Sequence, residues 1–262
     1  MAADGASDAA LAASLVREAG LLASRMRAGD DLAVARKTSV SDIVSAADTA
    51  AEALVVSRLL EARPDDGIVG EEGASRPSRS GRTWHVDPVD GTYNFVAGIP
   101  VWCSAAALVD DASGDTLVGA IYHPAQDELW LGGRDLRASC NGVELPRLTD
   151  APLAEISQVS YLHPATVHDT VLLDAWVRAV RGAATVRMLG SGSVELAAVA
   201  AGRLGCWVQH DSLSWDWLPG AAIVRAAGGM TASVEVGGHV WRAAGPPSAV
   251  ADAIRALTAD GS

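Results

Sequence analysis

The sequence predicts an α+β fold built of layers of helix and sheet. Two observations lead to this prediction. Segments with helical periodicity, short apolar strand-like runs and hairpin-like meanders follow one another, without an internal repeat or a low-complexity segment. The 262 residues, 49% of them hydrophobic, can bury a substantial core as one large domain or as two closely joined lobes.

The N-terminal part of the chain predicts two helices separated by a polar hinge. The first covers residues 7–26, where leucine and alanine recur at helical spacing. Residues 36–42 are polar and predict the hinge. The second helix is predicted from near Ser45 to Leu60, and Pro64 follows its end.

The middle of the chain predicts a series of strands. Short apolar runs alternate there with clusters of Gly, Asp and Ser, and an Asn-Gly pair at 141–142 is typical of a tight hairpin turn. Residues 74–81 are rich in Ser, Pro and Gly and predict a mobile loop. The predicted strands are residues 67–70, 83–86, 101–108, 116–122 and 128–131.

The second half predicts helices mixed with short strands. Residues 190–193 (Gly-Ser-Gly-Ser) precede an almost wholly apolar helix, which is therefore predicted to be buried. Gly228 and Gly229 mark the end of the next helix. The predicted helices are residues 167–180, 194–201, 215–227 and 249–257, and the predicted strands are residues 156–161, 185–189 and 205–208.

Charge and cysteine content exclude several classes of protein. A net charge of −12 and a pI of about 4.8 disfavour a nucleic-acid binder, because an acidic surface repels phosphate backbones. No secretory signal and no membrane-spanning run is predicted. The three cysteines are far apart and predict neither a disulfide framework nor structural zinc; they suit a reducing cytoplasm.

The segment of residues 87–95, Asp-Pro-Val-Asp-Gly-Thr-Tyr-Asn-Phe, carries the clearest chemistry. Asp87 and Asp90 repel each other and are costly to bury unless a cation neutralises them, so they favour a hard divalent ion. Gly91 lets the backbone approach a ligand, and the N–H groups after it can face an anion. These residues predict a metal-and-phosphate loop at the end of a strand. An ordinary strand-to-turn transition remains open, since Asp, Pro and Gly are also common turn residues.

Three further acidic residues stand at the ends of predicted elements: Glu71 after a strand, Asp216 at a helix start, and Asp48 in the second helix. Each also has a plain structural interpretation. Glu71 can be solvated surface, Asp216 can complement the dipole of its helix, and Asp48 can lie on an exposed helix face.

Together these segments resemble the inositol monophosphatase family of magnesium-dependent, lithium-sensitive phosphatases. The resemblance rests on Gly70-Glu71-Glu72, on residues 87–95 and on Trp215-Asp216 followed by Ala-Gly-Gly at 227–229. It runs from the first helix to the end of the chain. It implies the layered α/β sandwich of the inositol monophosphatase and sugar phosphatase type. It also implies a single domain over residues 1–262, with an N-terminal lobe of about 1–150 and a C-terminal lobe of about 151–262, in a cytoplasmic homodimer.

The resemblance also implies roles for individual residues. Glu71, Asp87 and the carbonyl of Val89 would hold one Mg²⁺; Asp87, Asp90 and Asp216 would hold a second; a third, weaker ion would lie near Glu71, and Li⁺ would inhibit. Residues 37–42 resemble the family's mobile loop beside the weaker ion. The implied catalytic residues are Asp48, Glu71 and Thr92, with Thr92 oriented by Asp48 to activate a water. The implied substrate-binding residues are Glu71, Val89, Asp90, Gly91, Thr92, Gly190, Ser191, Gly192, Gln209 and Asp216.

The substrate is predicted to be a small phosphate monoester, with inositol 1-phosphate as the default. Gln209 stands where inositol-hydrolysing relatives carry an acidic residue, which weakens that choice. Ala226 and Pro219 also depart from the family pattern. Histidinol phosphate, fructose 1,6-bisphosphate and a phosphoadenosine nucleotide remain alternatives on the same chemistry, and a non-catalytic metal-binding regulatory protein is a remote one.

Other motifs fail. Residues 87–98 lack the ligand pattern of an EF-hand, and residues 190–193 lack the Gly-Lys of a P-loop. The six histidines are scattered, and His85 is predicted to be a packed strand residue. The tryptophans are predicted to be core anchors, with Trp102 or Trp217 as candidates for lining a pocket near the site.

Overall fold

The computed structural model describes residues 2–29, 34–36 and 43–259, so the predicted mobile loop of residues 37–42 lies outside the described residues. The helices are α1 (Ala2–Arg27), α2 (Ala46–Ala62), α3 (Thr92–Ala97), α4 (Thr170–Arg181), α5 (Gly192–Ala200), α6 (Ser214–Ala226) and α7 (Pro247–Thr258), with short 3-10 turns η1 (Pro124–Gln126), η2 (Leu153–Glu155) and η3 (Pro164–Thr166).

The strands form two main sheets and one short pair. The larger sheet has the order β10-β9-β8-β7-β6-β5-β3-β4 and is antiparallel except between β3 and β5. The smaller sheet has the order β12-β11-β13-β15-β14. Their strands are β3 (Gly67–Gly70), β4 (Ser75–Arg76), β5 (Arg82–Asp90), β6 (Cys103–Asp110), β7 (Thr116–His123), β8 (Glu128–Gly133), β9 (Leu136–Cys140), β10 (Val143–Glu144), β11 (Ser157–Val159), β12 (Thr185–Arg187), β13 (Cys206–His210), β14 (Met230–Val236) and β15 (His239–Gly245), and the short pair is β1 (Ala35–Arg36) with β2 (Ile43–Val44).

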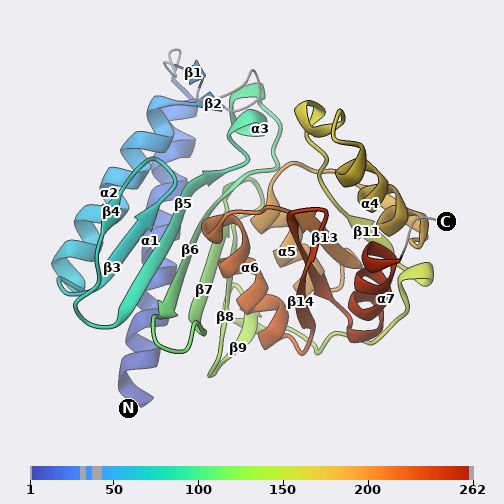
Figure 1. Ribbon diagram of the computed structural model, residues 1–262. Helices are drawn as coiled ribbons and strands as arrows, with labels where there is room; N and C mark the ends of the chain where they lie inside the picture. Colours follow the sequence, from blue (N-terminus) through green and yellow to red (C-terminus); the bar gives the residue numbers. More distant parts are fainter. Residues whose placement is uncertain (1, 30–33, 37–42, 260–262) are drawn as a thin grey trace.

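The two sheets and the helices stack as alternating layers, which confirms the predicted α+β sandwich (Figure 1). Helices α1 and α2 cover the outer face of the larger sheet, α5 and α6 lie between the sheets, and α4 and α7 cover the outer face of the smaller sheet. None of the helices in the described part of the chain is long and apolar enough to cross a membrane.

Helix α6 packs directly on the larger sheet because glycines in two strands leave room for it. A Cβ atom on Gly119 would lie 2.3 Å from the carbonyl oxygen of Pro219, and one on Gly132 would lie 2.8 Å from the Cα of Ile223. Pro219 is the sixth residue of α6 and cannot donate a helix hydrogen bond. Its contact with β7 holds α6, and therefore Asp216 near its start, against the sheet that carries Asp87.

The core confirms the predicted role of the tryptophans. Trp84, Trp102, Trp207 and Trp241 are among the largest fully buried side chains. Burial of a large apolar side chain stabilises the fold by about 1.5–3 kcal/mol. The three cysteines are free thiols, as predicted, and Cys140 is the one that is not fully buried.

Two local predictions were wrong or incomplete, and some elements were not predicted. Strand β5 does not end at Val86 but continues through Asp90, because Asp90 still pairs with Cys103 of β6. Residues 75–76, predicted as loop, pair with β3 as the edge strand β4. Helix α3 and the β14–β15 hairpin were not predicted. The side chains of β14 alternate only between exposed and half-buried positions, so the strand carries a weak apolar signal.

Candidate active site

A bulge in β5 brings two carboxylates to one side of the strand. Residues three apart in a regular strand point to opposite faces. The pairing of β5 with β6 shifts register between Asp87 and Asp90, and a bulge of this kind re-aims side chains. Carboxylate oxygens of Asp87, Asp90 and Asp216 lie within 4.8 Å of one another.

Asp216 reaches this cluster from helix α6. It is the third residue of the helix, and its Oδ2 accepts a hydrogen bond from the backbone N–H of Leu213 at 3.2 Å. Asp216 therefore does interact with the N-terminus of its helix, as the plain structural interpretation expected. The same side chain nevertheless faces Asp87 and Asp90, so it also belongs to the acidic cluster.

Asp90 is held by the second half of the chain. Its Oδ2 accepts a hydrogen bond from the backbone N–H of Ser193 at 2.5 Å, and its carbonyl oxygen accepts one from the Ser191 hydroxyl at 3.2 Å. Asp87 Oδ1 accepts a hydrogen bond from the N–H of Val89 at 3.0 Å. One oxygen of each carboxylate is therefore held by a backbone N–H, which fixes the orientation of its other oxygen.

The acidic cluster could hold a cation. Burial, followed by the charges of the neighbouring carboxylates, raises the pKa of Asp87 and of Asp216, and burial raises the pKa of Asp90. The donors around this point are carboxylate and carbonyl oxygens, which are the ligands of hard divalent cations. The residues therefore fit the metal dependence that is general in the family reported below.

Glu71 lies beside this cluster on the turn after β3. A buried carboxylate that was not predicted, Glu52 of α2, accepts hydrogen bonds from the N–H groups of Glu72 and Ala74 at 2.9 Å each. A Cβ atom on Gly70 would lie 2.3 Å from Glu52 Oε2, so a side chain there would displace the Glu52 carboxylate. Glu52 thus shapes the turn that presents Glu71 to the cavity.

Asp48 is fully buried and supports Thr92, so the interpretation that it lies on an exposed helix face is wrong. Its Oδ1 accepts a hydrogen bond from the Thr92 hydroxyl at 3.0 Å. Its Oδ2 accepts bonds from the N–H and the hydroxyl of Ser45, the N-cap of α2, at 2.9 and 2.5 Å. Burial raises the pKa of Asp48 and the Ser45 hydrogen bonds oppose that shift.

The loop before α5, residues 188–191, forms another wall of the cavity. Glu195 Oε1 accepts hydrogen bonds from the N–H groups of Leu189 and Gly190, and its Oε2 accepts one from the Trp207 indole. Asn94 donates to the carbonyl oxygen of Leu189 at 2.8 Å, which ties the loop to α3. Burial raises the pKa of Glu195 to about 8. Glu195 was missed, although a single charged residue in an apolar, buried helix was a readable signal.

A cavity of about 870 Å³ joins these parts. Asp48 does not line it and acts from behind Thr92. Tyr93, Asn94, Tyr161 and His163 also line the cavity and were not predicted. The predicted residues that line it are Glu71, Asp87, Val89, Asp90, Gly91, Thr92, Gly190, Ser191, Gly192, Gln209 and Asp216.

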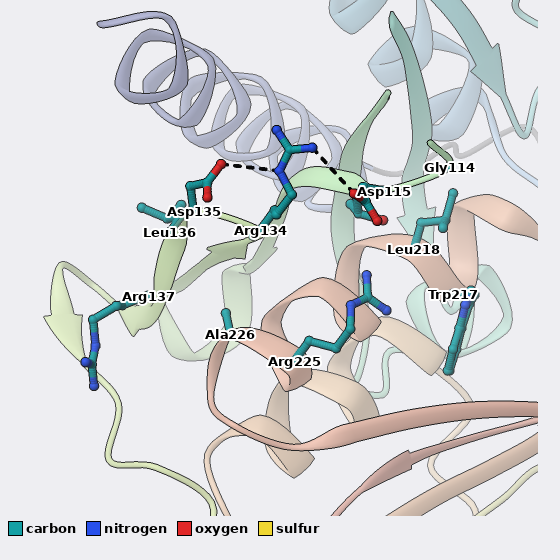
Figure 2. Close-up of a pocket in the computed structure, with 12 residues that line it drawn as sticks. Gly114, Asp115, Arg134, Asp135, Leu136, Arg137, Trp217, Leu218, Arg225 and Ala226 are labelled. Carbon is teal, nitrogen blue, oxygen red and sulfur yellow. Dashed lines mark hydrogen bonds and ion pairs between the residues drawn. The ribbon is translucent and has the colours of Figure 1, made fainter. Parts of the chain in front are cut away.

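A second pocket of about 670 Å³ lies between α6 and the ends of β7 to β9 (Figure 2). Its carboxylates are already paired, since Arg134 bonds to both Asp115 and Asp135. Trp217 lines this pocket and not the acidic cavity, while Trp102 packs edge-on against Phe95. Trp217 therefore lines a pocket, as predicted, but not the acidic cavity, and Trp102 lines neither of these two pockets. The acidic cavity is the candidate active site.

His85 is a half-buried strand residue, as predicted, and it lies outside the cavity. Its Nδ1 lies 2.8 Å from the hydroxyl of Ser214, the first residue of α6. Burial lowers the pKa of His85, which favours the neutral ring.

Comparison with known proteins agrees with this geometry. The sequence profile described as "Inositol monophosphatase family" matches residues 6–258. The chain is 36% identical over 205 residues to the inositol-1-monophosphatase of Rhizobium meliloti, covering 76% of this chain and 74% of that protein. It is 29% identical over 237 residues to the Nus factor SuhB of Escherichia coli, covering 90% and 88%. The crystal structure of the extragenic suppressor protein suhB from Bartonella henselae superposes with a TM-score of 0.84 at 28% identity, over 95% of this chain and 97% of that one. The chain belongs to the inositol monophosphatase family and is a phosphoric monoester hydrolase of that family.

Proposed function

We propose that the protein is a Mg²⁺-dependent phosphatase of a small phosphate monoester, with inositol 1-phosphate as the leading substrate. The observation that carries the proposal is the convergence of Asp87, Asp90 and Asp216 in one cavity with Thr92. Asp87, Asp90 and Asp216 would hold one Mg²⁺, and Glu71, Asp87 and the Val89 carbonyl another, with a weaker third ion near Glu71 and Li⁺ as an inhibitor. When bound, Mg²⁺ would neutralise the phosphate dianion and lower the pKa of a water.

The residues of the chain have separate tasks in this proposal. The Thr92 hydroxyl lies 3.0 Å from both Asp48 Oδ1 and the Val89 carbonyl oxygen; when it donates to Asp48, a lone pair on Thr92 Oγ1 can accept a hydrogen bond from the attacking water. As that water loses its proton to Thr92, the Thr92 proton moves towards Asp48 Oδ1. Gly91, which has no side chain and a φ of 93°, lets the phosphate approach the backbone.

The cavity wall favours a substrate with one phosphate and several hydroxyl groups. None of the described residues that line the cavity is Lys or Arg, so these residues offer a second phosphate no positively charged side chain. This argues against fructose 1,6-bisphosphate and against a phosphoadenosine nucleotide. Gln209 can donate and accept hydrogen bonds with hydroxyl groups, but it offers no charge to the amine of histidinol phosphate.

Phosphate release from a panel of monoesters tests the proposal. We expect turnover of inositol 1-phosphate that requires Mg²⁺, stops with EDTA and exceeds turnover of histidinol phosphate. Asp90→Asn should abolish release with an unchanged circular dichroism spectrum. The matched control is Asp135→Asn, which changes an exposed carboxylate at the other pocket and should leave turnover unchanged. Release that survives in Asp90→Asn would contradict the site, and silence across the panel would favour the non-catalytic alternative.

The organisation of the molecule extends the proposal. We propose one domain with lobes of about 1–150 and 151–262, because α6 packs against strands of both sheets. A cytoplasmic homodimer that binds no nucleic acid and no membrane remains our expectation. The free cysteines are compatible with a reducing compartment. Light scattering of the purified protein tests the dimer.

A further inference from the structure

Two imidazole rings and a carboxylate meet at the end of β13, outside the residues that line the acidic cavity. His210 is the last residue of β13, Asp211 follows it, and His239 begins the neighbouring strand β15. One ligand atom from each of the three lies within 4.8 Å of the others. His210 Nδ1 is 3.2 Å and His239 Nδ1 is 2.6 Å from the same oxygen, Asp211 Oδ2. Both ring nitrogens therefore face the same carboxylate oxygen.

Further hydrogen bonds orient these three side chains. Asp211 Oδ1 accepts a hydrogen bond from the N–H of Val240 at 3.0 Å, which directs Oδ2 towards the rings. His239 Nε2 lies 3.1 Å from Asp169 Oδ2, and Asp169 is itself fixed because its Oδ1 caps helix α4. A histidine that binds a metal through one ring nitrogen usually donates the other N–H to a carboxylate in this way. If the proton between Nδ1 and Asp211 Oδ2 is lost, Asp169 holds the remaining proton on Nε2, and Nδ1 of His239 can then bind a metal.

We propose that His210 Nδ1, Asp211 Oδ2 and His239 Nδ1 form a metal site separate from the acidic cavity, and that it binds Zn²⁺. Two imidazole nitrogens and one carboxylate oxygen suit a borderline cation, which takes three protein ligands and completes its coordination with a water. The same set suits Mg²⁺ poorly, because Mg²⁺ prefers oxygen ligands throughout. The donor types therefore separate this site from the all-oxygen cluster around Asp87.

A proton is the competitor for the site. Without a metal, hydrogen bonds to Asp211 and Asp169 raise the pKa of His239, so the ring can bridge the two carboxylates as an imidazolium. Zn²⁺ must displace the proton from Nδ1, and binding is therefore measured at mildly alkaline pH. A cluster that serves only as a hydrogen-bonded ion pair would bind no metal.

The position of the site gives the metal a structural task. It joins the end of β13 and the start of β15 to the N-terminus of α4 through Asp169. Gln209, the residue before His210, lines the active-site cavity. Bound Zn²⁺ would hold this wall in place, and we expect it to raise the melting temperature of the protein.

The test is a calorimetric titration of chelator-treated protein with Zn²⁺. Excess Mg²⁺ is present throughout to occupy the acidic cluster. His239→Asn removes one ligand, and His168→Asn is the matched control because His168 is an exposed residue in the same half of the chain. We expect the wild type and His168→Asn to bind one more Zn²⁺ than His239→Asn. Asp169→Asn should weaken this extra site about 10- to 100-fold, since it removes the carboxylate behind His239 but keeps a good helix cap.

Two further measurements distinguish Zn²⁺ binding at this site from Zn²⁺ binding elsewhere on the protein. Asp90→Asn, which alters the acidic cluster, should keep the extra Zn²⁺. Nitrogen chemical shifts of the His210 and His239 rings in the wild type should change on Zn²⁺ addition, and this readout does not depend on any variant folding. Equal Zn²⁺ stoichiometry in the wild type and His239→Asn, or ring shifts that do not respond to Zn²⁺, would overturn the proposal.

Discussion

The Thr92 hydroxyl donates a hydrogen bond of 3.0 Å to the carboxylate of Asp48, a residue 44 positions earlier in the chain. The other oxygen of that carboxylate is held by Ser45 at the start of α2. Helix α2 therefore begins at the point where it can orient the first residue of α3. Thr92 lines the cavity, and its hydroxyl lies 3.0 Å from the Val89 carbonyl oxygen as well as from Asp48.

This relationship predicts a difference between two substitutions at one position. Thr92→Ser keeps the hydroxyl and should retain turnover within roughly a few fold. Thr92→Val keeps the shape and removes the hydroxyl, so kcat should fall by about 10²- to 10⁴-fold, the usual contribution of a positioned proton acceptor. Steady-state phosphate release measures both, and similar rates in the two variants would contradict the role of the hydroxyl.

The acidic cluster predicts that the metal-free protein loses stability as the pH rises. The pKa values of Asp87, Asp90 and Asp216 are raised in the folded state, so the folded protein binds these protons more tightly than the unfolded chain. This stability is fully present below the ordinary Asp pKa of about 3.9 and is lost as the pH rises through the raised values. In the proposed function Mg²⁺ would replace the protons, so the increase in melting temperature on Mg²⁺ addition should grow with pH. An increase that is independent of pH would contradict the prediction.

Neutralising one carboxylate should separate stability from activity. Asp216→Asn keeps an oxygen for the Leu213 N–H and removes one repelling charge. Without metal at alkaline pH, the variant should be more stable than the wild type by at least about 1 kcal/mol, which corresponds to roughly one pKa unit. It should also lose phosphate release and most of its stabilisation by Mg²⁺. Thermal unfolding with EDTA and with Mg²⁺ measures both effects, and a metal-free variant less stable than the wild type would contradict the repulsion argument.

Two glycines in left-handed conformations provide a matched pair. Gly91 has a φ of 93° and Gly98 a φ of 83°, so a change to Ala costs about 1–2 kcal/mol of backbone strain at either position. A Cβ atom on Gly91 would also lie 3.1 Å from Gly190 O, whereas the nearest atom to one on Gly98 is 3.8 Å away. We therefore expect Gly91→Ala to lose more stability than Gly98→Ala and to lose activity as well. Denaturant unfolding and phosphate release check this, and equal effects would argue against the close approach.

Gln209 gives a prediction about the substrate. Gln209→Glu introduces a charged acceptor on the cavity wall, and charge-assisted hydrogen bonds to hydroxyl groups are stronger than neutral ones. We expect kcat/KM for inositol 1-phosphate to rise about tenfold, about 1.4 kcal/mol, relative to p-nitrophenyl phosphate, which has no ring hydroxyls. The Mg²⁺ dependence should not change. A uniform effect on both substrates would show that the residue does not contact hydroxyl groups.

Several elements could be predicted from the sequence because their signals are local. Strand β3 was predicted at its observed bounds, and helix α2 begins after the predicted Ser45. The β14–β15 hairpin was missed because its apolar alternation is weak, and its Gly237-Gly238 turn was not used as a signal. The continuation of β5 through Asp90 depends on pairing with β6, which local residue preferences do not reveal.

From the sequence alone, the carboxylates, the glycine and the threonine of residues 87–95 left both a metal-and-phosphate loop and an ordinary turn open, and the resemblance to the inositol monophosphatase family favoured the loop. Only the tertiary structure decided how these groups meet. The β5 bulge turns Asp87 and Asp90 to one side, and the packing of α6 on Gly119 carries Asp216 to them. The meeting of His210, Asp211 and His239 likewise follows from the pairing of β13 with β15. Side-chain direction depends on strand register and helix packing, which are set by contacts between residues distant in the chain.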